Sequence, residues 1–165
     1  MENLKIELLR ALEENARYSI PVLSKMLQTD EATIKQLIKT LREENIILKY
    51  TALVDWSKVE KHEEKVFALI DVKVQPKRGV GFDEIAERIY RYNEVQSVYL
   101  MSGAYDLSVM VEGKSMHEIA MFVSEKLSTL DSVLSTATHF MLKKYKHDGT
   151  VFEKVKEDKR IVVTP

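Results

Sequence analysis

One nine-residue stretch, VFALIDVKV at residues 66–74, constrains the fold of this chain more than any other feature. Apolar residues occupy every second position, while Asp71 and Lys73 fall between them. Because successive side chains of a β-strand point to opposite faces, this alternation predicts a strand with at least one buried face. Such a strand needs partner strands and a layer that covers it, which the rest of the chain has to supply.

The residues after this strand supply two helices and three more strands. Apolar residues at offsets 0, 3, 4, 7 and 8 from Phe82 predict one amphipathic helix, and a second stripe from Met116 to Leu127 predicts another. Strands are predicted over residues 95–101, 106–112 and 132–145. The order βαββαβ is that of the ferredoxin-like fold, in which two helices cover one face of an antiparallel sheet. The other face is not wholly polar, so we expect a second copy of the chain to cover it.

The first part of the chain has the pattern of three short helices followed by a strand. Helices are predicted over residues 3–14 and 20–27, and a third begins after Thr29 or Asp30, either of which can cap it. Residues 47–55, ILKYTALVD, have the composition of a strand. Three short helices with a tight connection between the last two predict a winged-helix-like helix-turn-helix, and the overall class is α+β.

The outward side of the third helix is polar and basic. Lys and Arg side chains can neutralise phosphates, while Gln and Thr can reach base edges, so this surface fits DNA. A solvated face of a dimerisation or linker module would have the same composition. The predicted DNA-binding residues are Thr29, Thr33, Lys35, Gln36, Lys39, Thr40 and Arg42.

Charge limits how tightly one such surface can bind. The 165 residues include 25 basic and 26 acidic side chains, and residues 1–55 contain eight basic and nine acidic ones. A globally basic nucleic-acid binder is therefore excluded. A single helix-turn-helix unit, which we call a reading head, should bind DNA weakly. Copies held in a fixed geometry bind far better through effective concentration, so we expect a homo-oligomer.

The sequence has no pattern typical of disulfide-bonded, membrane-spanning or metal-binding proteins. There is no cysteine, which excludes disulfides and thiolate zinc sites. No apolar stretch approaches the ~20 residues of a membrane span, so we expect a cytoplasmic protein without membrane contact. The four histidines do not have the spacing of metal ligands, and we expect neither a metal nor a cofactor.

Four runs of the sequence resemble the Lrp/AsnC (feast/famine) transcriptional regulators, and together they cover nearly the whole chain. They are NARYSIPVLSKML, TIKQLIKTLREENIILKYTALVD, VQSVYLMSGAYDLSVMV and STLDSVLSTATHFMLKKYK. The tail that ends RIVVTP resembles a branch of the family found in Gram-positive bacteria. One departure is Gln28, which stands where the turn of this family often has glycine.

The resemblance implies a homodimer, formed through the sheets, that assembles into a tetramer or octamer and binds double-stranded DNA. It also implies a small-molecule effector, often an amino acid, at a cleft between subunits. The alternative for the SGAYD turn is a purely structural one, a hairpin and an oligomer contact. The implied effector-binding residues are Leu100, Met101, Ser102, Gly103, Ala104, Tyr105, Asp106, Thr136 and Thr138.

We therefore predict a sequence-specific transcriptional regulator with four segments. Residues 1–54 form the helix-turn-helix domain, 55–65 a linker, 66–146 the effector-binding and oligomerisation domain, and 147–165 a tail. Residues 161–163 of the tail either fray or add a strand to a neighbouring sheet. The alternatives are a tetrapyrrole-binding enzyme, similar to sirohaem decarboxylases, and an architectural DNA-binding protein without an effector. No nucleophile–base pair or glycine-rich phosphate loop supports an enzyme.

Overall fold

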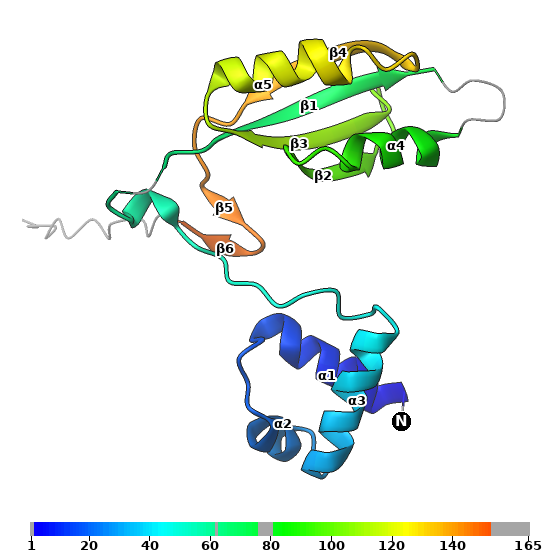
Figure 1. Ribbon diagram of the computed structural model, residues 1–165. Helices are drawn as coiled ribbons and strands as arrows, with labels where there is room; N and C mark the ends of the chain where they lie inside the picture. Colours follow the sequence, from blue (N-terminus) through cyan, green and yellow to red (C-terminus); the bar gives the residue numbers. More distant parts are fainter. Residues whose placement is uncertain (1, 62, 76–80, 153–165) are drawn as a thin grey trace, which may run out of the picture. The chain divides into compact units, whose positions relative to one another are not determined.

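The chain forms two compact units, residues 1–54 and 55–165, each with its own hydrophobic core. The computed structural model describes residues 2–61, 63–75 and 81–152 (Figure 1). The strand proposed at residues 161–163 lies outside the described residues. Among the helices of the described segments, none has the length and apolar character needed to cross a membrane.

The first unit is a cluster of three helices. They are α1 (Glu2–Glu14), α2 (Ile20–Met26) and α3 (Glu31–Glu43), which confirms the three predicted helices. Helices this short are marginal alone in water, so a shared core has to hold them. That core consists of Leu8, Ala11, Leu23, Ile34 and Leu41.

Three residues set the turns of the helix-turn-helix. Gln28, between α2 and α3, has a φ of +49°, which explains why glycine would suit this position. Asp30 rather than Thr29 caps α3, because its carboxylate accepts a 2.9 Å hydrogen bond from the Thr33 amide. Asn45 follows α3 with a φ of +55°, the left-handed conformation expected at a helix end.

The predicted strand at residues 47–55 is wrong for this structure. The described part of the first unit contains no strand after α3, and Leu48 is 82% exposed. The segment has the apolar residues of a strand, but a strand also needs a neighbour to pair with its backbone N–H and C=O groups. No partner strand is present for it in the described residues of one chain.

The second unit has the predicted ferredoxin-like fold. Its strands β1 (Val66–Val74), β2 (Val95–Leu100), β3 (Leu107–Gly113) and β4 (Val133–Phe140) form a sheet of order β2-β3-β1-β4, in which all neighbours are antiparallel. Helices α4 (Phe82–Tyr90) and α5 (Met116–Phe122) cover the sheet (Figure 1). A π-helical turn, η2 (Val123–Leu127), continues α5.

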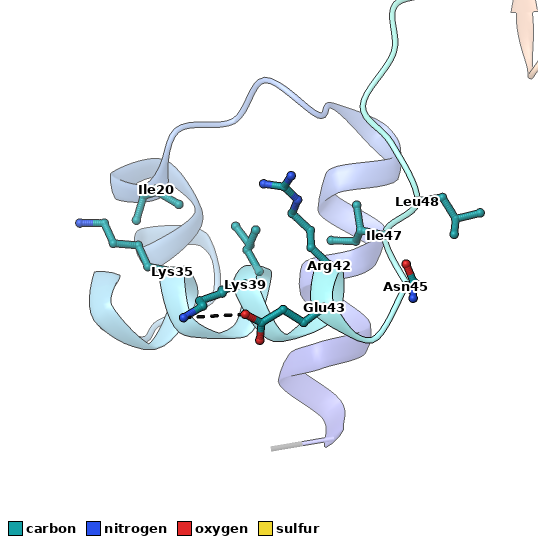
Figure 2. A pocket seen from close by; sticks show the side chains of 9 residues that line it. Ile20, Lys35, Lys39, Arg42, Glu43, Asn45, Ile47 and Leu48 are labelled. Carbon is teal, nitrogen blue, oxygen red and sulfur yellow. Dashed lines mark ion pairs between the residues drawn. The ribbon is translucent and has the colours of Figure 1, made fainter.

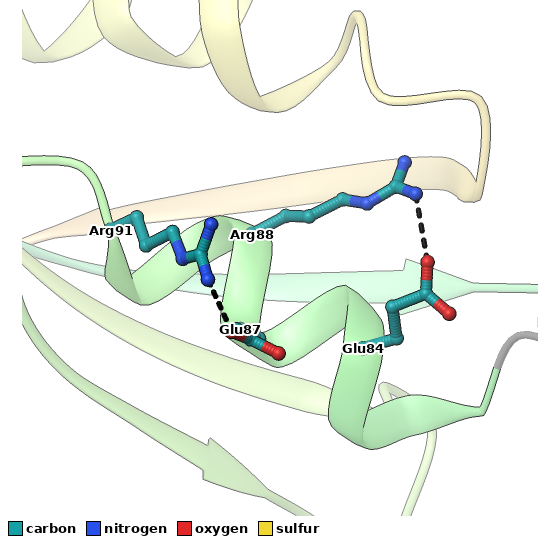
Figure 3. A network of polar contacts seen from close by, with 4 residues as sticks. All are labelled: Glu84, Glu87, Arg88 and Arg91. Atoms are coloured by element: carbon teal, nitrogen blue, oxygen red, sulfur yellow. Dashed lines mark hydrogen bonds and ion pairs between the residues drawn. The ribbon is translucent and has the colours of Figure 1, made fainter.

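Both helices pack on the same face of the sheet. The alternate residues Ala68, Ile70 and Val72 of β1 share a core with Ile85 of α4 and Ile119 of α5. The outer surface of α4 instead carries ion pairs one helical turn apart, Glu84–Arg88 and Glu87–Arg91 (Figure 3). The period of the apolar residues thus decides which side of each element is buried.

The opposite face of the sheet is open and mixed in character. Leu69 of β1 lies between Met110 of β3 and His139 of β4 in the strand register, and all three are partly or fully exposed. Asp71 accepts a 3.3 Å hydrogen bond from Ser108 Oγ and lies 3.4 Å from His139 Nε2. We call this surface the open sheet face.

The segments just before and just after the sheet differ from the prediction. The predicted linker contains a short 3₁₀ helix, η1 (Trp56–Lys58). The last strand ends at Phe140, five residues earlier than predicted, although the Met141 amide still donates a 2.8 Å hydrogen bond to the Phe67 carbonyl of β1. A small hairpin of β5 (Lys146–His147) and β6 (Thr150–Val151) follows it.

Candidate functional site

The outward side of α3 presents two separate stripes of side chains. At 100° per residue, the uncharged residues Thr33, Gln36 and Thr40 form one stripe, and the three cations form another, about 130° away around the helix axis. The core residues Ile34 and Leu41 lie on the remaining side of the helix, which faces the other helices, about 120° from either stripe. Two flanking stripes of this kind allow one helix to contact base edges and a phosphate backbone together.

The basic stripe lines a hollow of about 580 Å³ in the first unit (Figure 2). Lys35, Lys39 and Arg42 all reach this hollow, together with one acidic residue, Glu43. The Lys39 ammonium lies 3.8 Å from Glu43, and the Lys35 ammonium lies 3.7 Å from Glu31. Exposed pairs of this kind contribute well under about 1 kcal/mol, so a phosphate can replace either glutamate at little cost.

The cations and the uncharged stripe differ in how free they are. Arg42 is exposed and forms no ion pair with any described residue, so its guanidinium is available to an incoming anion. Thr33 is less available, because its hydroxyl donates a 2.5 Å hydrogen bond to the capping Asp30. Gln36 is exposed and only loosely bonded to the Thr40 hydroxyl, at 3.5 Å.

Thr29 lies in the turn before α3 and is half-buried. Its carbonyl oxygen accepts a 2.6 Å hydrogen bond from Ser24 Oγ, which fixes the turn to α2. Six of the seven predicted DNA-binding residues therefore lie on α3 and the seventh in the turn before it, and Thr29 and Thr33 also hold that turn in place.

The predicted effector turn is tied to β1 through Asp106. Its carboxylate accepts hydrogen bonds from the Val74 amide (2.9 Å) and from the Lys73 ammonium (3.2 Å). These bonds, the Val74 amide first, hold the pKa of the Asp106 carboxyl below its usual range, so the group is an anion at neutral pH. The Asp106 amide also donates to the Val72 carbonyl.

The rest of the turn is open to solvent. Residues 100–104 are exposed, and only Tyr105 and Asp106 are half-buried. Gly103 has a φ of +158°, and a Cβ added there would meet no atom within 4 Å. The backbone conformation, and not close packing, therefore favours glycine at this position, and the space beside it is open to a ligand or a neighbouring chain.

One chain does not bring Thr136 and Thr138 to this turn. They lie in β4 and pair with Val72 and Ile70 of β1 on the helix-covered side. Asp106 directly precedes β3 and bonds Lys73 on the open side. Two strand spacings, about 10 Å, separate the two groups. A single site containing all the predicted residues would need two copies of the chain.

Sequence reasoning missed the partner of Asp106. Lys73 and the Val74 amide complete the polar cluster at the turn, whereas the sequence pattern placed Lys73 only between the apolar positions of the strand. The alternation places Lys73 on the face opposite the core, but only the register of β1 and β3 brings it to Asp106, which directly precedes β3. The described residues contain no group of three or more His, Cys, Asp or Glu side chains suited to a metal ion.

Two family models match the chain. The Lrp/AsnC ligand binding domain matches residues 67–151, and a winged helix-turn-helix DNA-binding domain matches residues 1–47. The HTH-type transcriptional regulator YugG of Bacillus subtilis is 60% identical over 159 residues, which cover 96% of this chain and 95% of that protein.

Solved structures have the same fold. AsnC of Escherichia coli superposes with a TM-score of 0.66 at 22% identity, covering 93% of this chain and 99% of that one. A transcriptional regulator of Neisseria meningitidis in complex with L-methionine has a TM-score of 0.68 at 23% identity, covering 89% and 93%. The relatives and the matching domains are those of regulators, which confirms the prediction of a regulator over an enzyme. The chain is a DNA-binding transcriptional regulator that belongs to the Lrp/AsnC family.

Proposed function

We propose that this regulator reads double-stranded DNA with α3 and responds to an amino acid bound at the turn of residues 100–106. In this proposal the chain is a homodimer that assembles further into a tetramer or octamer, and it acts in the cytoplasm. The observation that carries the DNA-reading part is the arrangement of α3: an uncharged stripe for base edges beside a stripe of three cations for phosphates.

The charge around α3 makes each reading head a weak one. Asp30 and Glu31 stand at the N-terminal end of the helix, where they suit the helix dipole but repel an approaching phosphate. Lys35 and Lys39 also have glutamates beside them. Useful affinity then comes from several heads that bind together, which makes the assembly part of the mechanism.

The open sheet face supports the proposed pairing of copies. It combines apolar side chains, Leu69 and Met110, with the polar cluster of Asp71, Ser108 and His139. An apolar sheet face with satisfied polar groups is typical of an interface between identical subunits.

An amino-acid effector fits the turn of residues 100–106 chemically. The Asp106 carboxylate can accept from the ammonium group of the ligand in place of Lys73, and the released Lys73 can bind the carboxylate of the ligand. Thr136 and Thr138 would come from the neighbouring copy. Solved family members from N. meningitidis and Mycobacterium tuberculosis contain L-methionine, which supports this ligand class.

DNA binding is tested by fluorescence anisotropy with a labelled duplex from the region upstream of the gene. We expect the variant Lys39→Gln/Arg42→Gln to bind much more weakly and to lower the slope of log K against log salt by about 2, since two phosphate contacts are lost. The matched control is Arg10→Gln/Arg17→Gln, which removes two exposed cations of the same unit away from α3. Equal losses in both variants, or no binding by the unmodified protein at low salt, would exclude α3 as the reader.

Effector binding is tested by thermal melting of the full protein with each of the amino acids in turn. A ligand that binds only the folded assembly must raise the melting temperature. Asp106→Asn keeps an acceptor for the Val74 amide but removes the charge, so we expect this variant to fold and to lose the response. An unchanged response in Asp106→Asn would place the ligand elsewhere.

A further inference from the structure

Positive charge is concentrated in the segment that leads into the β5–β6 hairpin. Lys143, Lys144 and Lys146 fall within four residues, and Asp148 is the one acidic residue between positions 140 and 152. The second unit as a whole is not basic, because residues 55–165 contain 17 basic and 18 acidic side chains. The segment is therefore a local basic patch on a nearly neutral domain.

The segment is anchored to the sheet rather than loosely attached. The Lys144 ammonium lies 5.1 Å from the centre of the Phe67 ring in β1 and 5.5 Å from the centre of the Phe152 ring. The Phe152 amide donates to the Tyr145 carbonyl (3.0 Å), and the Lys58 ammonium donates to the Phe152 carbonyl (3.2 Å). Cation–π contacts and hydrogen bonds thus hold the base of the hairpin against β1.

The tip of the hairpin is a tight turn. Asp148 and Gly149 both have positive φ values, +44° and +74°, as a two-residue type I′ hairpin requires. Lys146 pairs with Val151 in the register, and both residues are exposed. The Lys143 ammonium lies 5.0 Å from the ring of Tyr145, which is itself 66% exposed. Two exposed lysines therefore flank an exposed aromatic ring on a framework of fixed shape.

We propose that this patch is a second contact of the regulator with the phosphate backbone of DNA. The inference rests on the proposed function, because DNA bound by α3 is the polyanion available to the same molecule. Cations spread along the segment of residues 143–146 match an extended row of phosphates, whereas a small anion needs donors that converge on one point. The patch adds affinity without sequence preference and lengthens the DNA that each subunit engages.

The test uses the full-length protein and a labelled duplex of about 60 base pairs from the upstream region, at KCl concentrations between about 50 and 200 mM. In the variant Lys143→Gln/Lys146→Gln, Lys144 is left in place so that the hairpin keeps its anchor. Two lost phosphate contacts lower the salt slope by about 1.8, so the ratio of wild-type to variant affinity changes about twelvefold across that range.

Two further variants separate this contact from general charge and folding effects. Arg88→Gln/Arg91→Gln removes two cations of the same unit at α4 (Figure 3), outside the proposed contact, and should leave the slope unchanged. Lys143→Arg/Lys146→Arg keeps the charge and should keep the slope. An unchanged slope in the glutamine variant, an equal loss in the α4 variant, or a loss in the arginine variant overturns the inference. If the α3 variant Lys39→Gln/Arg42→Gln still binds like the unmodified protein, the proposed function fails instead.

Discussion

Gly113, the last residue of β3, lies close against Ile119 of α5. A Cβ built on Gly113 would lie 2.9 Å from Cγ1 of Ile119, whereas carbon atoms in contact are about 3.5–4.0 Å apart. Ile119 is only 2% exposed and packs in the core of the second unit, so it cannot turn out to solvent. Gly113→Ala therefore forces α5 and the sheet apart by roughly half an ångström.

The expected cost follows from two opposing effects. Adding a methyl group to a packed core costs about 1–3 kcal/mol, and replacing a strand glycine by alanine returns about 0.5–1 kcal/mol of backbone entropy. The net loss of unfolding free energy is about 1–2 kcal/mol. In a unit of about 100 residues this lowers the melting temperature by about 5–10 °C.

Differential scanning calorimetry at one fixed protein concentration measures this loss. The two units have separate cores, so Gly113→Ala should shift the transition of the second unit and leave that of the first in place. Ile119→Ala alone should cost about 2–4 kcal/mol by leaving a cavity. The double variant should be about 1–2 kcal/mol more stable than the sum of the two losses, because the new methyl group occupies that cavity. Strict additivity would refute the contact.

Three further outcomes are expected. Hydrogen bonds from the hydroxyl and amide of Thr33 lower the pKa of the capping Asp30 in the folded protein. The Asp30 carboxylate therefore stabilises α3 fully above the pKa of the unfolded chain, about 3.9. This stabilisation is lost as the pH falls through the lower pKa of the folded state. Asp30→Asn should flatten the pH dependence of helix melting, followed by circular dichroism, in that acid range. Gln36→Ala should relax the choice of DNA sequence in competition binding without changing the salt slope, since the proposed mode places its uncharged side chain at base edges. Leu69→Lys on the open sheet face should weaken self-association by about tenfold or more, because it buries an unpaired charge against Met110 of the same face. Sedimentation velocity measures this loss, and an unchanged mass distribution would locate the subunit interface elsewhere.

The elements of this fold could be predicted because their burial follows a simple period. β1 begins and ends where the alternation of Val66 to Val74 does, and α3 follows the apolar stripe that contains Ile34 and Leu41. The strand predicted at residues 47–55 failed because pairing is not a property of one segment: its composition permits a strand, but no neighbour is present. The β5–β6 hairpin was not predicted although Asp148–Gly149 is a known hairpin signal, because strands of two residues are too short to show an alternation.

The candidate sites depend more strongly on distant contacts. The exposed cations of α3 could be predicted from helical spacing alone, but the loss of the Thr33 hydroxyl to the cap could not. The position of Asp106 was recognised, yet its two hydrogen bonds to β1 join residues 32 and 33 positions apart. Only the register of β1 and β3 reveals them, and a register is set by the fold as a whole.

That register also connects two proposed roles of the second unit, effector binding at the turn of residues 100–106 and the pairing of copies through the open sheet face. Lys73 contacts Asp106 at the effector turn, while Asp71 and Leu69 follow at two-residue intervals on the same face of β1. In the proposed mechanism, a ligand that draws Lys73 away from Asp106 changes the charge at one end of the surface on which two copies pair. The effector then acts on the assembly and not on α3 directly, and its coupling to DNA equals the difference in its affinity for the two assemblies. Because each reading head is weak, even a modest shift in the spacing of the heads changes DNA affinity strongly.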